Sequence, residues 1–316
     1  MRIEYHRTLM ADEVRNRAFK AALAASIIKG SSVVADIGAG TGLIGLMAAR
    51  LGAREVYLYE VAEVAGVARQ VLKKNRVRTC HIMPFHSTDA VDPPRVDIVV
   101  SETLGNYAFE ENIVATMNDA RQRHLKPGGT LIPSRIRQIV APVIAARFHE
   151  ELLAWDRVAG DLGLDIDLSY ARTMSLNNIY VRRVAPDDLL DGGACAVCWD
   201  DADLTRACSS TRKGEAQFRI AKGTVVYGFA VWWEADLSPG ITLSTAPGAA
   251  QTHWEQLYFP LLTPIMMRAG QIVGITLSSR SSEQAGTHLQ WKAQHFDRDG
   301  KMLARQALDL DKGYLP

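Results

Sequence analysis

The sequence predicts an α/β protein in two parts, a parallel-sheet domain followed by a mostly antiparallel β domain. Over roughly the first 130 residues, short apolar strand patterns alternate with helical patterns, as in a parallel α/β sheet. After Pro133 the pattern changes to β-rich runs separated by turn residues, which is typical of antiparallel strands. A chain of 316 residues is long enough to bury two sizeable cores.

In the first part, helix-stopping residues mark the ends of the predicted helices. Gly30 and Gly52 close two of them, and the run Lys-Pro-Gly-Gly stops the last. The predicted strands are short apolar runs between these helices. In chain order we expect helix 9–30, strand 32–37, helix 41–52, strand 55–60, helix 61–75, strand 95–101 and helix 110–125.

The second part contains five clear strand-like runs and one mixed segment. The segment 148–190 is partly helical and partly irregular, so it is either an inserted arm or a loose linker. The expected strands are 135–146, 223–237, 271–281, 287–297 and 301–311.

Composition narrows the class of protein. The net charge is +1, which argues against a broad nucleic-acid interface, since such surfaces are usually basic. The N-terminus has no apolar signal core, and no run reaches the ~18 apolar residues of a membrane span. Cys195 and Cys198 form one C-x-x-C pair, but no second pair or nearby histidine completes a zinc site. We expect no metal and a cytoplasmic protein with reduced thiols.

A glycine-rich loop follows the strand at 32–37. Gly38, Gly40 and Gly42 lie between a predicted strand and a predicted helix, where glycine lets the backbone approach a ligand closely. Read from Gly40, the loop also matches the G-x-G-x-x-G pattern of dinucleotide sites, and Glu60 follows 20 residues later. The loop therefore predicts a nucleotide-like cofactor, either NAD or S-adenosylmethionine.

Asp36 favours S-adenosylmethionine over NAD. A carboxylate two residues before the first glycine is unfavourable beside an anionic pyrophosphate, but it suits the cationic methionyl end of S-adenosylmethionine. The alternative is that Asp36 only caps the backbone of the loop. Glu60 is expected to accept hydrogen bonds from the ribose hydroxyl groups.

Acidic residues surround an apolar stretch between Ser101 and Glu111, which we call the acidic loop. Glu102 follows a strand and Glu111 begins the next helix, so both reach the edge of the sheet where ligands bind. Clustered carboxylates are favourable when they share a cation, and guanidinium is the best partner. A metal ion is the rival, although no D-x-D cluster supplies further ligands. A favourable helix dipole explains Glu110 and Glu111 but not Glu102.

The acidic loop resembles the double-glutamate loop of the protein arginine methyltransferases, which has the form S-E-x-x-G with a second Glu nine residues after the first. The glycine loop, the segment "HRTLMADEVRNRAF" and the "THW" at 252–254 also resemble that family, in the same order. The resemblance implies a doubly wound Rossmann-like methyltransferase domain over 1–132 and an antiparallel β-barrel domain over 133–316. It further implies an inserted helical dimerisation arm at about 155–190, and hence a homodimer.

The resemblance also implies residue roles. Arg15 would pair with the methionyl carboxylate of S-adenosylmethionine, and Thr88 or Asp89 would contact the adenine. With the glycine loop, the expected cofactor-binding residues are His6, Arg15, Asp36, Gly38, Gly40, Glu60 and Thr88. The expected catalytic residues are Glu102, Glu111, His253 and Asp12, and the expected substrate-binding residues are Glu102, Glu111 and Trp254.

These roles describe an in-line methyl transfer to a guanidino nitrogen. Glu102 and Glu111 would hold the guanidinium, which fixes its approach to the methyl group. His253 would pair with Asp12, and either Glu111 or His253 would take the released proton.

The chain departs from the family near its N-terminus. The aromatic segment that usually precedes the first helix is absent, and Tyr5 does not match its pattern, so the cover over the cofactor is missing, shortened or supplied otherwise. Leu9 replaces a common methionine, which leaves the product type open. We expect a protein or peptide arginine as substrate, with free arginine or another small guanidine as the alternative. A non-catalytic dimeric adaptor and an NAD-dependent oxidoreductase are further alternatives.

Overall fold

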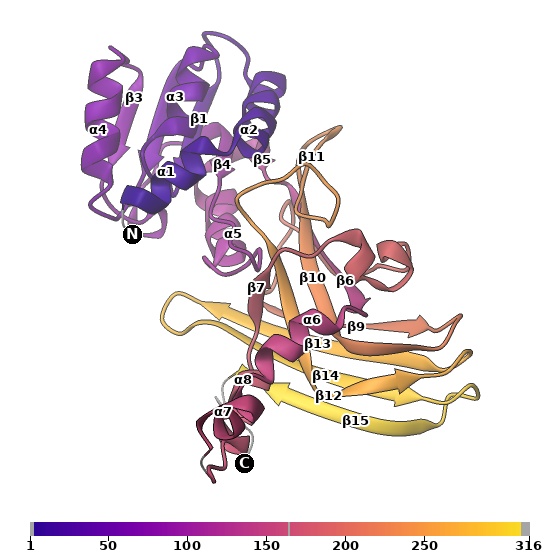
Figure 1. Ribbon diagram of the computed structural model, residues 1–316. Helices are drawn as coiled ribbons and strands as arrows, with labels where there is room; N and C mark the ends of the chain where they lie inside the picture. Colours follow the sequence, from indigo (N-terminus) through magenta and orange to yellow (C-terminus); the bar gives the residue numbers. More distant parts are fainter. Residues whose placement is uncertain (1–2, 164, 311–316) are drawn as a thin grey trace.

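The computed structural model describes residues 3–163 and 165–310 (Figure 1). Positions 1, 2, 164 and 311–316, which some predicted ranges include, lie outside these residues. The first part is a five-stranded parallel sheet with the strand order β3-β2-β1-β4-β5. Its elements are α1 (Ile3–Ala11), α2 (Glu13–Ser26), β1 (Val33–Ile37), α3 (Leu43–Arg50), β2 (Glu55–Tyr59), α4 (Ala65–Lys74), β3 (Cys80–Met83), the 3₁₀ turn η1 (Ser87–Asp89), β4 (Val96–Ser101), α5 (Ile113–Arg123) and β5 (Leu125–Ile132).

The prediction of one helix over 9–30 is wrong, because the chain forms two helices that meet at Asp12. Asp12 has an extended backbone conformation, and its carboxylate accepts a hydrogen bond from Arg15 N–H, so it caps α2. A side chain that satisfies a free N–H in this way starts a new helix. The second helix ends at Ser26, before Gly30.

Two strands of the parallel sheet were not predicted. β3 lies at the edge of the sheet, and its four residues are only partly buried or exposed, so they carry no clear apolar signal. β5 contains Lys126-Pro-Gly-Gly, which predicted only the end of a helix. Pairing of β5 with β4 in the folded sheet overrides this local preference for a turn.

The second part consists of two antiparallel sheets. The larger has the order β7-β12-β10-β6-β8, with β11 paired to β10, and the smaller has the order β15-β14-β13-β9. Sequence patterns missed β7, β8, β9, β11 and β12; β9, for example, exposes charged side chains at alternate positions and buries few apolar ones. The strands are β6 (Arg135–Val143), β7 (Tyr180–Arg182), β8 (Val197–Asp203), β9 (Thr211–Arg219), β10 (Thr224–Ser238), β11 (Ile241–Ser244), β12 (Gln256–Met267), β13 (Ile272–Ser282), β14 (Gly286–Phe296) and β15 (Met302–Asp309).

Three helices follow β6, largely within the segment 148–190, for which the sequence predicted either an inserted arm or a loose linker. They are α6 (Ala146–Leu152), α7 (Trp155–Leu162) and α8 (Ser169–Leu176). Figure 1 shows α7 and α8 projecting from the antiparallel part, away from the parallel sheet. Two short 3₁₀ turns, η2 (Pro186–Asp188) and η3 (Leu190–Gly193), lead to β8. Among the described helices, none combines the length and the apolar character that a membrane crossing requires.

The two parts share one hydrophobic core. Val100 at the end of the parallel sheet, Tyr107 in the acidic loop, and Trp233 and Ile275 in the antiparallel sheets belong to the same buried cluster. The acidic loop therefore lies between the two parts and is packed from both sides.

Candidate active site

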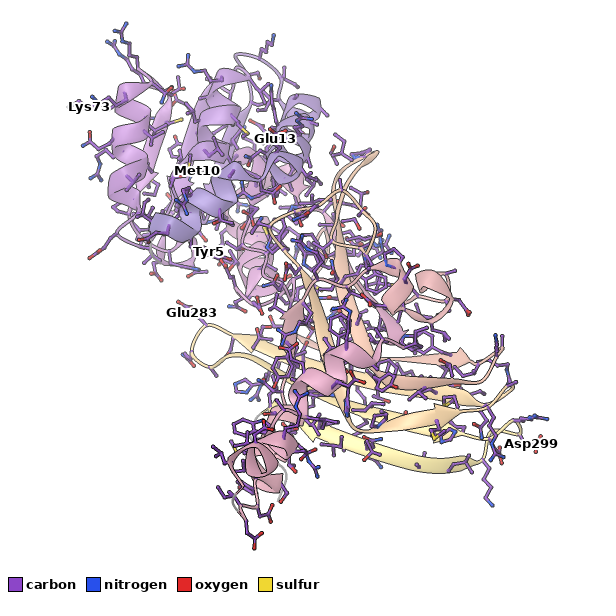
Figure 2. All side chains as sticks on the ribbon, viewed as in Figure 1. Tyr5, Met10, Glu13, Lys73, Glu283 and Asp299 are labelled. Carbon is purple, nitrogen blue, oxygen red and sulfur yellow. The ribbon has the colours of Figure 1, made fainter. Side chains whose placement is uncertain are left out.

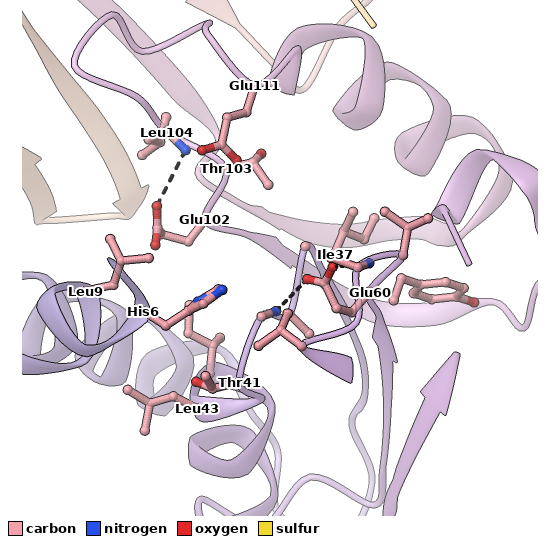
Figure 3. A pocket seen from close by; sticks show the side chains of 18 of the residues that line it. His6, Leu9, Ile37, Thr41, Leu43, Glu60, Glu102, Thr103, Leu104 and Glu111 are labelled. Atoms are coloured by element: carbon pink, nitrogen blue, oxygen red, sulfur yellow. Dashed lines mark hydrogen bonds between the residues drawn. The ribbon is translucent and has the colours of Figure 1, made fainter. Parts of the chain in front are cut away.

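A cavity of about 260 Å³ lies at the carboxyl ends of β1, β2 and β4, beside α1. This is the edge where open α/β sheets bind their ligands. Figure 3 shows Glu102 and Glu111 toward one end of this cavity and Glu60 toward the other, with His6 between them. The cavity brings together these predicted residues: His6, Leu9, Arg15, Gly38, Gly40, Glu60, Glu102 and Glu111.

The glycine loop forms one wall of the cavity. Gly38 and Gly40 have φ values of 71° and 55°, a left-handed conformation that glycine adopts without strain. His6 packs over Gly40, where a Cβ atom would lie 3.4 Å from the imidazole ring. Glu60 accepts hydrogen bonds from Gly40 N–H and Ala62 N–H, both at 2.8 Å. Each carboxylate oxygen has two lone pairs, so Glu60 keeps capacity for further donors.

Asp36 does not line the cavity, so the prediction that it faces a cationic cofactor is wrong. Its side chain is buried, and Oδ2 accepts a hydrogen bond from Gly45 N–H at 2.8 Å. That N–H lies in the first turn of α3, where it has no partner within the helix. Asp36 therefore caps the first turn of α3, and its Oδ1 has no partner among the described residues. The alternative interpretation, a cap on the backbone of the loop, placed its hydrogen bond a few residues too early. Burial raises the pKa of Asp36 to about 7.

The other end of the cavity differs from the prediction as well. Neither Thr88 nor Asp89 lines it; the Thr88 hydroxyl instead contacts His86 Nδ1 at 2.7 Å. Ser87 and Thr116 supply the hydroxyl-bearing side chains there. Sequence did not predict the 3₁₀ turn η1, and of its three residues only Ser87 lines the cavity.

The acidic loop is held in place by side chains from the antiparallel part. Trp254 Nε1–H donates to Leu104 O at 2.8 Å, and Trp233 Nε1–H donates to Gly105 O at 3.0 Å. Both indoles are buried, and so are Leu104 and Gly105. Water therefore cannot replace these two hydrogen bonds, and they fix the loop in place. Trp254 does not line the cavity, which corrects the prediction that it contacts the substrate.

Glu110, the extra acid of the loop, has a structural role. Its pKa is raised by burial, while the backbone N–H groups of Tyr107 and Asn106 favour its ionised form. It folds over Gly105, where a Cβ atom would come 1.9 Å from Glu110 Oε2. Glu110 therefore closes the loop, and Glu102 and Glu111 are left for the cavity.

Glu102 forms an ion pair with Arg15, which differs from the prediction that Arg15 pairs with a cofactor carboxylate. Arg15 Nε–H donates to Glu102 Oε2 at 2.6 Å, and Nη2–H donates to the same oxygen. Both side chains are less than a tenth exposed, and a buried guanidinium needs a charged partner. Burial raises the pKa of Glu102, and Arg15 opposes that rise.

This ion pair leaves free binding capacity on both residues. Arg15 has five N–H donors, of which Nε–H, one Nη2–H and one Nη1–H (to Asn16) are used. Two donors therefore remain on its cavity-lining guanidinium. Among the described residues, Glu102 Oε1 accepts only a long hydrogen bond of 3.4 Å from Leu104 N–H, so it too can accept another donor.

Glu111 reaches the open mouth of the cavity. Burial in the crowded cavity and the charges of Glu102, Glu110 and Glu60 raise its pKa to about 7. A group with this pKa is about half ionised near neutral pH, and a cation that shares the site favours its ionised form.

The predicted pair between His253 and Asp12 is present. Asp12 Oδ2 accepts hydrogen bonds from His253 Nδ1–H at 2.7 Å and from His253 N–H at 2.8 Å. A carboxylate only accepts, so Nδ1 carries the proton, and the buried Nε2 has no partner among the described residues. Burial lowers the pKa of His253 more than Asp12 raises it. His253 does not line the cavity.

Helix α1 covers the cavity and adds two lining residues that the sequence missed, Tyr5 and Met10. Tyr5, His6, Leu9 and Met10 all line it, at the i, i+1, i+4, i+5 spacing of one helix face. Figure 2 shows Tyr5 on the side of α1 toward the antiparallel strands. This spacing was a usable signal, but the predicted helix began only at Leu9.

Family models match both parts of the chain. A model of the arginine methyltransferase oligomerization subdomain matches residues 137–296. A model of ribosomal protein L11 methyltransferase matches residues 21–159.

Relatives of known name align over most of the chain. Protein arginine N-methyltransferase 6 of Xenopus tropicalis is 32% identical over 263 residues, which cover 80% of this chain and 77% of that protein. An arginine N(omega)-methyltransferase of Streptomyces achromogenes subsp. streptozoticus is 30% identical over 287 residues, covering 86% and 75%.

Solved structures share the fold at lower sequence identity. The Trypanosoma brucei PRMT1 enzyme–prozyme heterotetrameric complex with AdoHcy has a TM-score of 0.85 at 22% identity, covering 96% of this chain and 97% of that one. An open conformation of Arabidopsis thaliana protein arginine methyltransferase 10 has a TM-score of 0.82 at 20% identity, covering 98% of both. From the match at 137–296 and the identity to named relatives, the chain belongs to the protein arginine N-methyltransferase family.

Proposed function

We propose that this protein transfers the methyl group of S-adenosylmethionine to a guanidino nitrogen of arginine in a protein or peptide. The observation that carries the proposal is the pair of carboxylates, Glu102 and Glu111, at one end of a cavity that the glycine loop lines. Family membership supports the methyltransferase reading and removes the support for NAD.

The donors and acceptors of the cavity fit S-adenosylmethionine. Gly38 and Gly40 allow close approach of the backbone, and Glu60 has lone pairs for ribose hydroxyl groups. The two remaining N–H donors of Arg15 fit the methionyl carboxylate, so Arg15 can bridge that group and Glu102. When bound, S-adenosylmethionine supplies an activated methyl group.

The chain's own residues orient the acceptor and remove a proton. Glu102 Oε1 and Glu111 bind two edges of the guanidinium and keep positive charge on the nitrogens that do not react. A nitrogen that gains a methyl group becomes more acidic, and Glu111, with a pKa near 7, takes its proton. His253 is enclosed beside Asp12, so it positions Asp12 and the start of α2 instead.

We further propose two domains, 1–132 and 133–316, the second a closed β-barrel with an oligomerisation arm. Two contacts support closure. Gly214 of β9 lies against Trp199 O of β8, and Gln306 of β15 exchanges two hydrogen bonds with the backbone of Thr263 in β12. Helices α7 and α8 expose apolar side chains, which supports homodimerisation through this arm.

Free arginine is the second candidate substrate. The relative from Streptomyces favours this candidate, because its name, arginine N(omega)-methyltransferase, mentions arginine without the word protein. The acidic mouth of the cavity accepts either substrate, because both present the same guanidinium.

A labelled-methyl assay tests both proposals. The protein is incubated with S-adenosylmethionine carrying a labelled methyl group, beside arginine-rich peptides and free arginine. We expect label in a peptide, and Glu102→Gln and Glu111→Gln should each lower turnover by about 100-fold or more, with S-adenosylhomocysteine binding retained. Label in free arginine alone would assign the second substrate. No label in either acceptor would contradict the proposed function.

A further inference from the structure

In the proposed function, the two carboxylates bind the edges of the acceptor guanidinium, and neither of them contacts its flat faces. The group is planar, and all its N–H bonds lie in that plane. Carboxylates therefore bind it from the side. Its flat faces bind aromatic rings well, because the π electrons attract the positive charge.

Tyr5 is placed to supply such a ring. It lines the same cavity as Glu102 and Glu111. It lies one turn before Leu9 on α1, so both side chains project from the same helix face. The side chain is 45% exposed, which leaves part of the ring free to contact a ligand.

The charges around Tyr5 set it apart from the other phenol of the cavity. Burial raises the pKa of Tyr5, and the carboxylates of Glu111, Glu102 and Glu110 raise it further. Burial also raises the pKa of Tyr59, but the titratable groups that act on Tyr59 are Tyr57 and Arg123. Tyr5 is therefore the phenol beside the acids, and it stays neutral, so its ring adds no charge to the acidic end.

We propose that Tyr5 binds one face of the acceptor guanidinium while Glu102 and Glu111 bind its edges, so that Tyr5 positions the acceptor nitrogen. The inference rests on the proposed function and extends it to a third acceptor-binding residue. It also gives α1 a role: the helix that covers the cavity carries one wall of the acceptor site. A cation held over an aromatic ring at a half-exposed site gains roughly 2- to 30-fold in affinity.

The test separates the ring from the hydroxyl group. Tyr5→Phe keeps the ring, and Tyr5→Leu removes it with little loss of volume. We expect Tyr5→Leu to raise the acceptor KM about tenfold with little change in the Kd of S-adenosylhomocysteine, and Tyr5→Phe to restore the KM. The matched control is Thr8→Ala, which changes an exposed residue of α1 that does not line the cavity. An unchanged acceptor KM in Tyr5→Leu would overturn the proposal.

Equilibrium binding keeps this test independent of catalysis. Binding of an arginine peptide and of the matching citrulline peptide is measured in the presence of S-adenosylhomocysteine, because citrulline keeps the shape and loses the charge. Wild type should prefer arginine, and Tyr5→Leu should lose about tenfold of that preference. Equal preference in both proteins refutes the role of Tyr5. A wild type that binds arginine but transfers no methyl group refutes the proposed function alone, and one that binds no arginine refutes both.

Discussion

At the scale of single residues, the site places three carboxyl groups in three different environments. Glu102 is buried but paired with Arg15, Glu111 lies at the mouth among other acids, and Asp36 is buried beneath the glycine loop. These differences give each group a different response to pH. Their partners differ as well: Glu102 faces Arg15, Glu111 faces other acids, and Asp36 faces the N–H of Gly45.

The first prediction concerns Glu111 and the pH dependence of catalysis. Its pKa is raised to about 7, and only its ionised form attracts a guanidinium. We therefore expect kcat/KM for the acceptor to fall about tenfold per pH unit below 7, because this ratio reports the ionisation of the free enzyme. Glu111→Gln should lower kcat/KM at pH 8 and remove the slope between pH 5.5 and 8. An unchanged slope in this variant would assign the ionisation to another group.

The second prediction concerns Asp36 and the pH dependence of stability. Burial raises its pKa from 3.8 to about 7, so between these values the folded protein binds a proton that the unfolded chain releases. The stability that Asp36 contributes is therefore fully present below pH 3.8 and is lost as the pH rises toward 7. Each unit of the shift corresponds to about 1.4 kcal/mol.

Asp36→Asn isolates this effect, because the amide oxygen still accepts the hydrogen bond from Gly45 N–H but does not ionise. Thermal unfolding of both proteins is compared from pH 5 to 8. The variant should gain stability relative to wild type as the pH rises. A constant difference in melting temperature over this range would show that Asp36 does not titrate there.

At the scale of elements, the acidic loop owes its shape to contacts that are distant in sequence. Glu102 and Glu111 could be identified from their spacing in the chain, and the pair of His253 with Asp12 from the family pattern. The two indoles that hold Leu104 O and Gly105 O could not, because Trp233 and Trp254 lie more than 120 residues further along. Their effect depends on how β10, which carries Trp233, and the segment before β12, which carries Trp254, pack against the acidic loop.

The same distinction explains what sequence reasoning could achieve for the fold. Strands such as β1, with five consecutive buried residues, carry their own signal. The edge strand β3 and the charged strand β9 do not, since their conformation comes from pairing with neighbours. Asp36 was misassigned for a related reason: a carboxylate beside a glycine loop looks the same in sequence whether it faces a ligand or a helix N-terminus.

The third prediction tests how the acidic loop is closed. Gly105→Ala would place a Cβ atom 1.9 Å from Glu110 Oε2 and 2.7 Å from Glu110 Cβ, so the loop must shift. We expect a loss of ~1–3 kcal/mol in stability and a clear fall in kcat/KM, since Glu102 and Glu111 flank this turn. The double variant Gly105→Ala with Glu110→Ala removes the clash with the carboxylate and keeps only the contact with Glu110 Cβ. It should recover part of both losses in a double-mutant cycle measured by denaturation and by methyl transfer. Simple additivity of the two changes would contradict this account of the loop.

At the scale of the whole molecule, the antiparallel part both supports the acidic loop and carries helices that project away from the site. Helices α7 and α8 and their connection expose several large apolar side chains: Trp155, Val158, Leu162, Ile166, Tyr170 and Met174. An isolated apolar residue on a surface is ordinary, but a cluster on a projecting segment is typical of a protein interface. The family model that spans this region is that of an oligomerization subdomain.

The last prediction follows from this surface. Leu162 and Ile166 are 60% and 39% exposed, so replacing both with aspartate costs the monomer little but places charge in an apolar interface. Wild type should behave as a dimer in size-exclusion chromatography with light scattering, and Leu162→Asp/Ile166→Asp should show the monomer mass of 34.7 kDa. The matched control is Val91→Asp, which changes a residue that is 94% exposed in the parallel-sheet part and should leave the dimer intact.

Because α7 and α8 lie far from the cavity in the chain's own fold (Figure 1), any loss of methyl transfer in the monomeric variant would show that the partner subunit supports the site. A wild type that stays monomeric at all concentrations, or a double variant that stays dimeric, would exclude this arm as the interface.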